Sequence, residues 1–287
     1  KQIIHKSLSI TLINHSFCFL FMTTQPFSHR QLFIQNRDLA SLRRVLLNPE
    51  KLPQRVFYDL DGSLHKGLFA PLLRGITNAD LALYLAFHLP LSQLPEFIEE
   101  NIHLFFYDRQ TLANGVSLQD RETHTRYLVD TFHNVLSRIP QEKIEDAARL
   151  LPRLQYPHAG TALRSLQGEG AIISCAPQPI VDAYGRALSI PYCFGNPLSA
   201  LEQRQHGRIY GAQDKERIAL SLCLDETTER AIAIGDSADD LGLASAVKML
   251  SAESVVIALH GRSEALEARA DIIASSWKDL LALLESS

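Results

Sequence analysis

Two aspartates separated by one leucine follow an apolar segment in RVFYDLDGSLHKG. The carboxylates of Asp59 and Asp61 would repel each other in a folded chain unless positive charge lay between them. A polar turn at the end of a strand would account for such a pair, and so would an active site that holds a metal ion. The Asp-Gly turn alone does not decide between them, so the other polar residues must.

Further polar residues follow other apolar segments of the chain. GAIISCA contains Ser174, and RAIAIGDS leads into Asp236, with Asp240 one helical turn later. Lys215 opens the helical stretch before that second segment. Ligands of open α/β sheets bind outside the carboxyl ends of the strands. We therefore expect these side chains to gather at one edge of a sheet.

Together, these side chains indicate one kind of chemistry. Two or three carboxylates and water molecules around a hard cation make a magnesium site. A hydroxyl group and an ammonium group bind the oxygens of a phosphoryl group. A carboxylate can also attack phosphorus to form an aspartyl-phosphate, with the metal offsetting the repulsion between the two anions. Taken singly, each residue is equally consistent with a turn, a helix cap or a surface charge; together they favour a site.

The elements that must position these residues alternate along the chain. Short, continuous apolar runs are typical of strands that are buried on both faces of a parallel sheet. We predict strands at 55–60, 170–176, 230–237, 254–260 and 270–276. Helical patterns lie between them, and a short helix is expected at 37–47. This alternation predicts the α/β class, with a doubly wound parallel sheet.

Helical periodicity alone dominates between the first predicted strand and the second. We interpret this stretch as a helical insertion after the first strand. The predicted catalytic core comprises 23–67 and 154–287, and the insertion comprises 68–153.

Four motifs in order resemble those of the haloacid dehalogenase superfamily of phosphatases. FYDLDGSL matches its first motif, AIISCA its second, Lys215 in GAQDKERI its third and AIAIGDSADD its fourth. The resemblance spans 55–284 and implies a Rossmann-like core, for which the insertion would be an α-helical cap. The polar stretch at 196–211 is similar to the phosphoserine-phosphatase-like branch.

The resemblance implies a role for each motif residue. Asp59 would be the nucleophile, and Asp61 would protonate the leaving oxygen and then activate water. Mg²⁺ would be held by the Asp59 carboxylate, the Asp61 backbone carbonyl and the Asp236 carboxylate. Asp240 would orient the lysine or support the metal shell. The residues expected to bind phosphate are Ser174, Lys215, Ser63 and Gly62.

The sequence says less about the substrate than about the reaction. Phosphoserine phosphatases carry a glutamate soon after the first motif, where this chain reads His65, Lys66, Gly67 and Leu68. Two potential cations there argue against phosphoserine; they fit either a more anionic substrate or a solvated loop. The apolar cap segments fit helix packing or, alternatively, an entrance for a lipid phosphate. A phosphotransferase would use the same residues, whereas a non-catalytic relative should have lost Asp59, Asp61 or Lys215.

Composition limits the partners. A net charge of −4 over 287 residues gives no broad basic field, so nucleic acid is not an expected partner. A hydrophobic fraction of 46% and a charged fraction of 21% are typical of soluble globular proteins. Four cysteines without metal-ligand spacing favour a reducing, cytoplasmic location. A small phosphorylated substrate is the expected partner, and the oligomeric state is left open.

The first residues have two interpretations. The apolar stretch SLSITLINHSFCFLF follows Lys6 and resembles the hydrophobic part of a signal peptide, but no A-x-A-like cleavage site follows. It is also short for a membrane span. We expect Met22 to be the natural start, with 1–22 a non-native or untranslated leader and no integral membrane segment.

Overall fold

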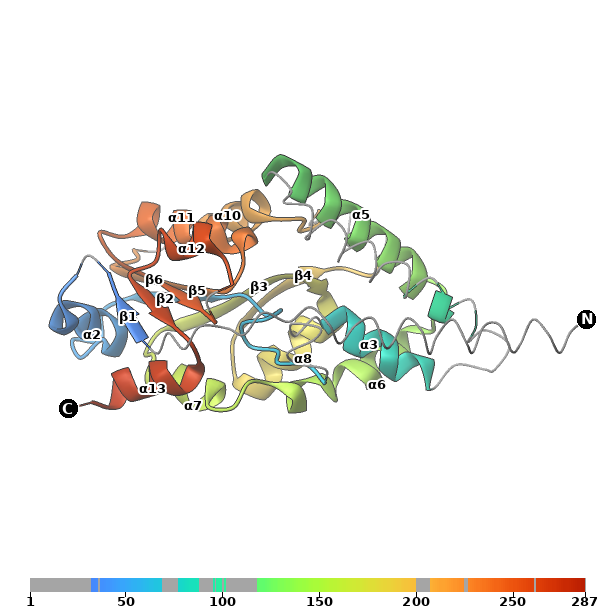
Figure 1. Cartoon of the computed structure of the whole chain (residues 1–287), viewed down its shortest axis with the longest axis horizontal. Coiled ribbons are helices and arrows are strands. Elements are labelled where there is room, and N and C mark those ends of the chain that lie inside the picture. Colours follow the sequence, from blue (N-terminus) through green and yellow to red (C-terminus); the bar gives the residue numbers. More distant parts are fainter. Residues whose placement is uncertain are drawn as a thin grey trace, which may run out of the picture. The chain divides into compact units, whose positions relative to one another are not determined.

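A seven-stranded sheet forms the centre of the described structure, with helices on both faces (Figure 1). The computed structural model describes residues 32–35, 37–68, 77–87, 95, 97–99, 101, 118–199, 207–224, 227–260 and 262–286, with side chains of the long helix from 122 onward. The expected leader, residues 1–22, lies outside the described residues and stays a prediction.

The strands and helices follow one another in near-regular alternation. The strands are β1 (Leu32–Ile34), β2 (Gln54–Tyr58), β3 (Glu169–Pro177), β4 (Tyr192–Asn196), β5 (Arg230–Gly235), β6 (Glu253–Leu259) and β7 (Ile272–Ala274). The α-helices are α2 (Leu39–Leu47), α3 (Thr77–Ala86), α5 (Leu118–Leu136), α6 (Gln141–Ala148), α7 (Ala159–Ser165), α8 (Gln178–Leu188), α10 (Ala212–Ser221), α11 (Leu241–Leu250), α12 (Glu264–Glu267) and α13 (Trp277–Glu285). Two 3₁₀ turns are η1 (Leu151–Leu154) and η2 (Ala238–Asp240).

The strand order is β1-β7-β6-β5-β2-β3-β4. All neighbours are parallel except β1 and β7. The chain passes from β2 to β3 and β4 on one side, then to β5, β6 and β7 on the other. The order therefore reverses between β2 and β5, which is the place where ligands of such sheets bind. The predicted doubly wound α/β fold is confirmed.

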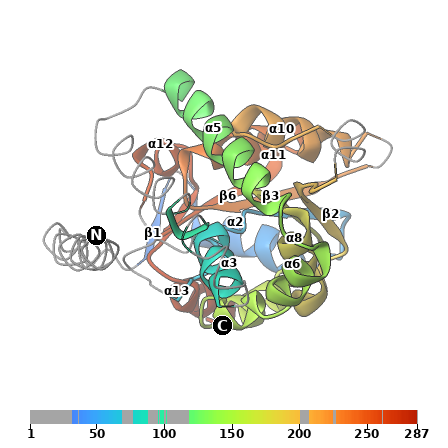
Figure 2. The ribbon, with the colours of Figure 1, turned by 90° about the vertical axis from the view of Figure 1, so that its right-hand side faces the viewer.

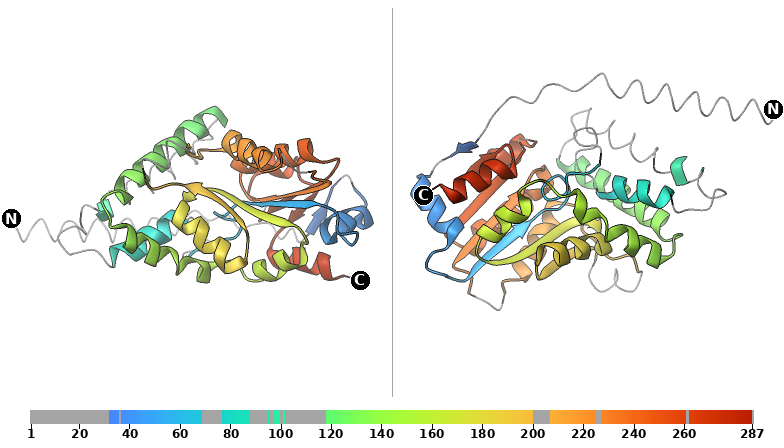
Figure 3. Two further views of the ribbon diagram at one scale, coloured as in Figure 1. Left: turned by 180° about the vertical axis from the view of Figure 1, so that it is seen from behind. Right: turned by 90° about the horizontal axis from the view of Figure 1, so that it is seen from below.

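The two faces of the sheet are covered by different helices. Val56 and Tyr58 of β2 pack in one apolar cluster with α2, α7, α8 and α13, while Phe57 packs with α10 and α11 on the other face. Successive strand residues point to opposite faces, so both faces of β2 must be apolar. α7 and α13 also pack against each other (Figure 3).

The predicted strand boundaries need two kinds of correction. β2 ends at Tyr58 rather than at residue 60, and β5 ends at Gly235 rather than at residue 237, because the chain turns there to present the aspartates. β1 and β4 were not predicted. Both are edge strands, paired on one side only, and neither forms a long apolar run.

Helices occur where the helical insertion was predicted, in the parts that the structure describes. α3, α5 and α6 lie between β2 and β3 in the sequence. α6 packs against both α3 and α8, as Figure 2 shows. Ile144 of α6 and Leu81 of α3 share one apolar cluster with the sheet. The boundaries of a separate cap domain stay a prediction. No helix in the described ranges combines the length and apolar character needed to span a bilayer.

The last helix fixes the loop that follows β2. The indole Nε1 of Trp277 donates a hydrogen bond of 2.7 Å to the backbone carbonyl of Ser63, and both groups are buried. Leu64 and His65 donate their backbone N–H groups to the carbonyl of Leu60. The loop with the two aspartates is therefore held by its own turn and by α13.

We predict that Trp277→Phe lowers the free energy of unfolding by about 1–3 kcal/mol, because the buried Ser63 carbonyl loses its donor. Urea unfolding should be followed by far-UV circular dichroism, since Trp277 is the only tryptophan. Phe87→Leu, at a side chain that is 79% exposed, is the control and should change stability by less than about 0.5 kcal/mol. Equal unfolding midpoints for the two variants would contradict the anchoring role.

Candidate active site

Asp59 lies at the carboxyl end of β2, at the point where the strand order reverses. Its backbone N–H donates to the Ile234 carbonyl of β5 at 3.0 Å, so the β2–β5 pairing continues up to this residue. Its side chain is buried. Burial and the nearby Asp240 raise the pKa of Asp59, while Lys215 opposes that rise. An aspartate in this environment requires cations beside it.

Lys215 supplies one of these cations. It lies in the first turns of α10 and is almost completely buried. Its Nζ donates to Asp59 Oδ1 at 2.8 Å and to Asp240 Oδ1 at 2.6 Å. Burial alone would lower the pKa of Lys215, but the carboxylates of Asp240 and Asp59 outweigh it and raise that pKa. The side chain is therefore a fixed ammonium group that joins the ends of two strands.

Hydrogen bonds to the Asp240 side chain hold the loop after β5 in place. Asp240 Oδ2 accepts the backbone N–H of Asp236 at 2.9 Å and that of Ser237 at 3.0 Å. Its other oxygen accepts from Lys215. Asp240 thus orients the lysine and the loop, which is the first of the two supporting roles expected for it.

Asp236 pairs with an arginine that the sequence analysis missed. Arg262 Nη1 donates to Asp236 Oδ2 at 2.8 Å, and its Nη2 donates to the Tyr156 hydroxyl at 2.8 Å. The Tyr156 ring stacks on His260 with centroids 4.3 Å apart. Burial raises the pKa of Asp236 to about 7, although Arg262 opposes the rise. Arg262 follows the carboxyl end of β6, so the strand-end rule would have found it had it been applied there.

Asp61 lies beyond the strand and faces the helical insertion. Its Oδ1 accepts the backbone N–H of Thr77, the first residue of α3, at 2.8 Å. Burial raises the pKa of Asp61, and the Thr77 N–H offsets part of that rise. A carboxyl group with a raised pKa is suited to donating a proton.

The two predicted serines have different surroundings. Ser174 is buried in β3, just after its last regular pair with β4, and its Oγ accepts the Ala176 N–H at 3.2 Å. β3 continues to Pro177, so Ser174 does not end the strand as expected. The Ser63 hydroxyl faces Asp236 Oδ1 at 3.5 Å. Their roles toward phosphate stay predictions.

Gly62 allows the two aspartate loops to approach each other. Its φ is +77°, a conformation that side chains disfavour. A Cβ at this position would lie 2.3 Å from Asp236 Oδ2 and 2.5 Å from Arg262 Nη1. Only glycine therefore permits this contact between the first and fourth motifs.

The donor set fits a divalent cation. One carboxylate oxygen from each of Asp59, Asp236 and Asp240 lies within 4.8 Å of the others. With Asp61 there are four carboxyl groups against the cations of Lys215 and Arg262, an excess of two negative charges when all are ionised. Mg²⁺ is usually bound through one or two carboxylates, with water molecules completing an octahedron, so this set of carboxyl groups suits it. Asp59 and Asp236 carry the available ligand atoms, because Asp240 already binds Lys215 and backbone N–H groups.

The loop before Lys215 is fixed from two sides. The Asn196 side chain at the end of β4 accepts the Ile209 N–H at 2.7 Å and donates to the Cys175 carbonyl at 2.8 Å. Asp130 of α5 accepts from the Tyr210 hydroxyl at 3.1 Å and forms an ion pair with Arg208. The insertion therefore contacts the segment that leads into α10.

The environment of His65 differs from both sequence interpretations, a group that faces an anionic substrate and a residue of a solvated loop. Its imidazole is fully buried between Tyr184 and Asp80, so it is not a cation exposed to substrate or solvent. Lys66, in contrast, is exposed on the loop. Much of the apolar cap sequence, including 88–94 and 102–117, lies outside the described residues, so the lipid-phosphate entrance stays a prediction.

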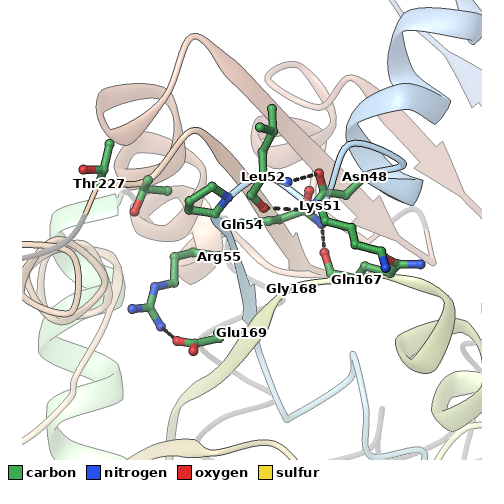
Figure 4. A pocket seen from close by; sticks show the side chains of 11 residues that line it. Asn48, Lys51, Leu52, Gln54, Arg55, Gln167, Gly168, Glu169 and Thr227 are labelled. Carbon is green, nitrogen blue, oxygen red and sulfur yellow. Dashed lines mark hydrogen bonds and ion pairs between the residues drawn. The ribbon is translucent and has the colours of Figure 1, made fainter.

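A cavity of about 380 Å³ lies at the opposite end of the sheet, at the amino ends of β2 and β3 (Figure 4). Arg55 pairs with Glu169 there, and the Gln54 amide donates to the Gln167 carbonyl. These polar groups bind one another, and the cavity contains none of the predicted catalytic residues.

Comparison with known proteins gave results for structure only. No protein family matches the chain, and no curated protein matches it significantly. A phosphoserine phosphatase, solved as an analogue of its phospho-aspartyl intermediate, has a TM-score of 0.55 and 16% identity over 82% of this chain and 100% of that one. Cytosolic 5′-nucleotidase IIIB, bound to cytidine, has a TM-score of 0.58 and 14% identity over 90% and 94% of the two chains. A phosphoserine phosphohydrolase-like protein from Francisella tularensis has a TM-score of 0.53 and 16% identity over 80% and 99%.

The chain has the fold of haloacid dehalogenase-type phosphatases. The fold resemblance expected from the four motifs is thereby confirmed. At such low identity the likeness concerns the fold, and the chemistry has to be argued from the site itself.

We predict that Gly62→Ala weakens Mg²⁺ binding by at least about tenfold, because its Cβ would displace the Asp236 carboxylate. Gly207→Ala is the matched control: its φ is +71°, but nothing lies within 4 Å of its Cβ. Both variants should lose about 1–2 kcal/mol of stability through the positive φ. Isothermal titration calorimetry with Mg²⁺ separates them, and equal affinities would contradict the proposed contact.

Proposed function

We propose that this protein is a magnesium-dependent phosphatase that hydrolyses a phosphate monoester through an aspartyl-phosphate on Asp59. The observation that carries the proposal is the position of Lys215, whose buried ammonium group bonds to Asp59 and Asp240 at once, with Asp236 alongside. The fold likeness to phosphatases supports the same reaction class.

The first half-reaction transfers the phosphoryl group to the protein. A carboxylate oxygen of Asp59 attacks phosphorus, and the bond from phosphorus to the ester oxygen breaks. Asp61 donates its proton to the leaving oxygen, a role supported by its raised pKa. Lys215 holds a phosphoryl oxygen, as its short distance to Asp59 permits. Bound Mg²⁺, held by Asp59 and Asp236, would offset the repulsion between the two anions.

The second half-reaction regenerates Asp59. Asp61, now a carboxylate, removes a proton from a water molecule whose oxygen attacks phosphorus. The acyl-phosphate bond breaks, and inorganic phosphate and the Asp59 carboxylate are released. The raised pKa of Asp61, caused mainly by burial, supports this use of one residue as acid and then base.

The substrate we propose is a small phosphate monoester without an ammonium group near the phosphate. No acidic residue occurs between Gly62 and Leu68, and the nearby Asp80 already accepts from His65. This argues against phosphoserine despite the fold likeness to phosphoserine phosphatases. Nucleoside monophosphates, sugar phosphates and lipid phosphates form the screen, and a cytoplasmic location remains part of the proposal.

Phosphate release from an aryl phosphate should require added Mg²⁺ and stop with a chelator, because Asp59 and Asp236 need the cation to accept an anionic substrate. A colorimetric phosphate assay measures this, with Arg149→Ala, at an exposed side chain just after α6, as a control that keeps full activity. Full activity in excess chelator would refute the role of the metal.

Asp59→Asn should abolish turnover and give no phosphoenzyme, since an amide is not a nucleophile here. Asp61→Asn keeps the nucleophile but loses the acid and base, which typically costs 10²–10⁴-fold. It should form phosphoenzyme faster from an aryl phosphate than from an alkyl phosphate, as the aryl group leaves without a proton. Quenched-flow labelling with a radioactive ester measures both variants.

Labelled Asp59→Asn protein, or wild-type turnover by Asp61→Asn, would show that the roles are assigned wrongly. Added alcohols test the alternative reaction: a phosphorylated acceptor in place of inorganic phosphate would identify a phosphotransferase. Absence of any phosphoenzyme with every ester would favour a non-catalytic protein.

A further inference from the structure

The imidazole of His65 is a buried junction between the catalytic loop, α3 and α8. Its Nδ1 lies 2.6 Å from the Tyr184 hydroxyl of α8, and its Nε2 lies 2.7 Å from Asp80 Oδ2 of α3. His65 is 0% exposed and Asp80 is 3% exposed. Neither residue belongs to the four motifs, and the proposed chemistry does not use them.

The hydrogen bonds determine where the protons lie. The Tyr184 hydroxyl donates its one proton to the Leu151 carbonyl at 2.8 Å, so its oxygen must accept from His65 Nδ1. Burial raises the pKa of Tyr184, which therefore remains a phenol. The Asp80 carboxylate accepts from His65 Nε2 and from the Leu68 backbone N–H. Both ring nitrogens are therefore engaged, and His65 and Asp80 form a buried hydrogen-bonded pair.

This pair lies beside the proposed general acid. Asp80 is in the first turn of α3, and Thr77, the first residue of the same helix, donates its N–H to Asp61 Oδ1 at 2.8 Å. His65 follows Asp61 by one turn of the catalytic loop and makes a β-bridge with it. The loop and the helix start are thus joined twice, through Asp61–Thr77 and through His65–Asp80.

The two contacts differ in their surroundings. The Asp61–Thr77 contact is a single backbone N–H bond to one carboxylate oxygen. The His65–Asp80 contact joins two side chains that are 0% and 3% exposed, and Asp80 also accepts the Leu68 backbone N–H. The buried pair therefore holds the start of α3, and the geometry of the Asp61–Thr77 bond depends on it.

We propose that the His65–Asp80 pair positions the general acid Asp61 by holding the start of α3 against it. His65 and Asp80 are positioning residues, since they act through the Thr77 N–H and not on the substrate. The inference rests on the proposed phosphatase function for its kinetic consequence. Its structural part, the coupling of Asp80 to the Thr77–Asp61 bond, is independent of that function.

Asp80→Ala tests the coupling, because alanine keeps the helix and removes the acceptor of His65. Asp80→Asn is the conservative rescue, since its amide oxygen can still accept from Nε2. Tyr184→Phe is the matched control: it removes the other hydrogen bond of the same imidazole, which comes from α8 and not from α3. If Asp80→Ala fails to fold, Asp80→Ser, which retains a hydroxyl for the Leu68 N–H, takes its place.

Hydrogen exchange of the Thr77 amide in the full chain is the first measurement. We expect exchange to accelerate at least about tenfold in Asp80→Ala and to stay near wild type in Asp80→Asn and Tyr184→Phe. The second measurement is the ratio of kcat for an aryl to an alkyl phosphate. Asp80→Ala should raise this ratio by about tenfold, below the 10²–10⁴-fold effect of general acid–base catalysis itself.

Unchanged Thr77 exchange in Asp80→Ala would overturn the proposal, and so would an equal rise of the aryl-to-alkyl ratio in Tyr184→Phe, which would mean a general loss of packing. If wild-type protein hydrolyses no ester, the proposed function fails, and Thr77 exchange alone decides the coupling.

Discussion

The ammonium group of Lys215, buried between the carboxylates of Asp59 and Asp240, is the interaction on which the site depends. An unpaired buried ammonium costs several kcal/mol, so this lysine requires both partners. Each comes from a different element: Asp59 from the end of β2, and Asp240 from the turn after β5. The pairing of β2 with β5 and the packing of α10 on α11 bring the two carboxylates to the lysine.

The other residues of the candidate site can be understood from its excess of negative charge. Burial raises the pKa values of Asp59, Asp61 and Asp236, which means that the protein alone does not neutralise them. Arg262 partly compensates Asp236, and Gly62 leaves room for both groups. A site that remains short of positive charge is prepared for a cation.

The helical insertion contacts the site through the elements that carry its chemistry. α3 contacts Asp61 through Thr77, and α5 contacts the segment before Lys215 through Asp130. Arg126 of α5 also lies over the Tyr210 ring at 4.2 Å. Asp59, the proposed nucleophile, is held instead by the sheet and by Lys215 of α10. The insertion is therefore placed to influence proton transfer and phosphate binding more than nucleophilic attack.

Local sequence determined the class of the fold, the central strands and the predicted site residues, because buried parallel strands leave continuous apolar runs and the polar residues follow them directly. Asp59, Lys215 and Asp240 meet as expected, since parallel strands bring their carboxyl ends to one edge. The edge strands β1 and β4 were missed because they pair on one side only and carry a weaker apolar signal.

Only the tertiary structure decided the partners of the remaining groups. His65 read as a substrate-facing cation or a loop residue, but it is buried against Asp80, fifteen positions away, and Tyr184. Arg262, in the loop after β6, donates to Asp236, and the Ser63 hydroxyl also faces Asp236. A periodic sequence pattern indicates which face of a helix or strand is buried. It does not indicate which distant side chain will lie beside a buried charged group, because that depends on how the whole chain packs. For this reason the sequence by itself predicted that Asp59, Lys215 and Asp240 gather, whereas only packing decided that Asp61 meets Thr77.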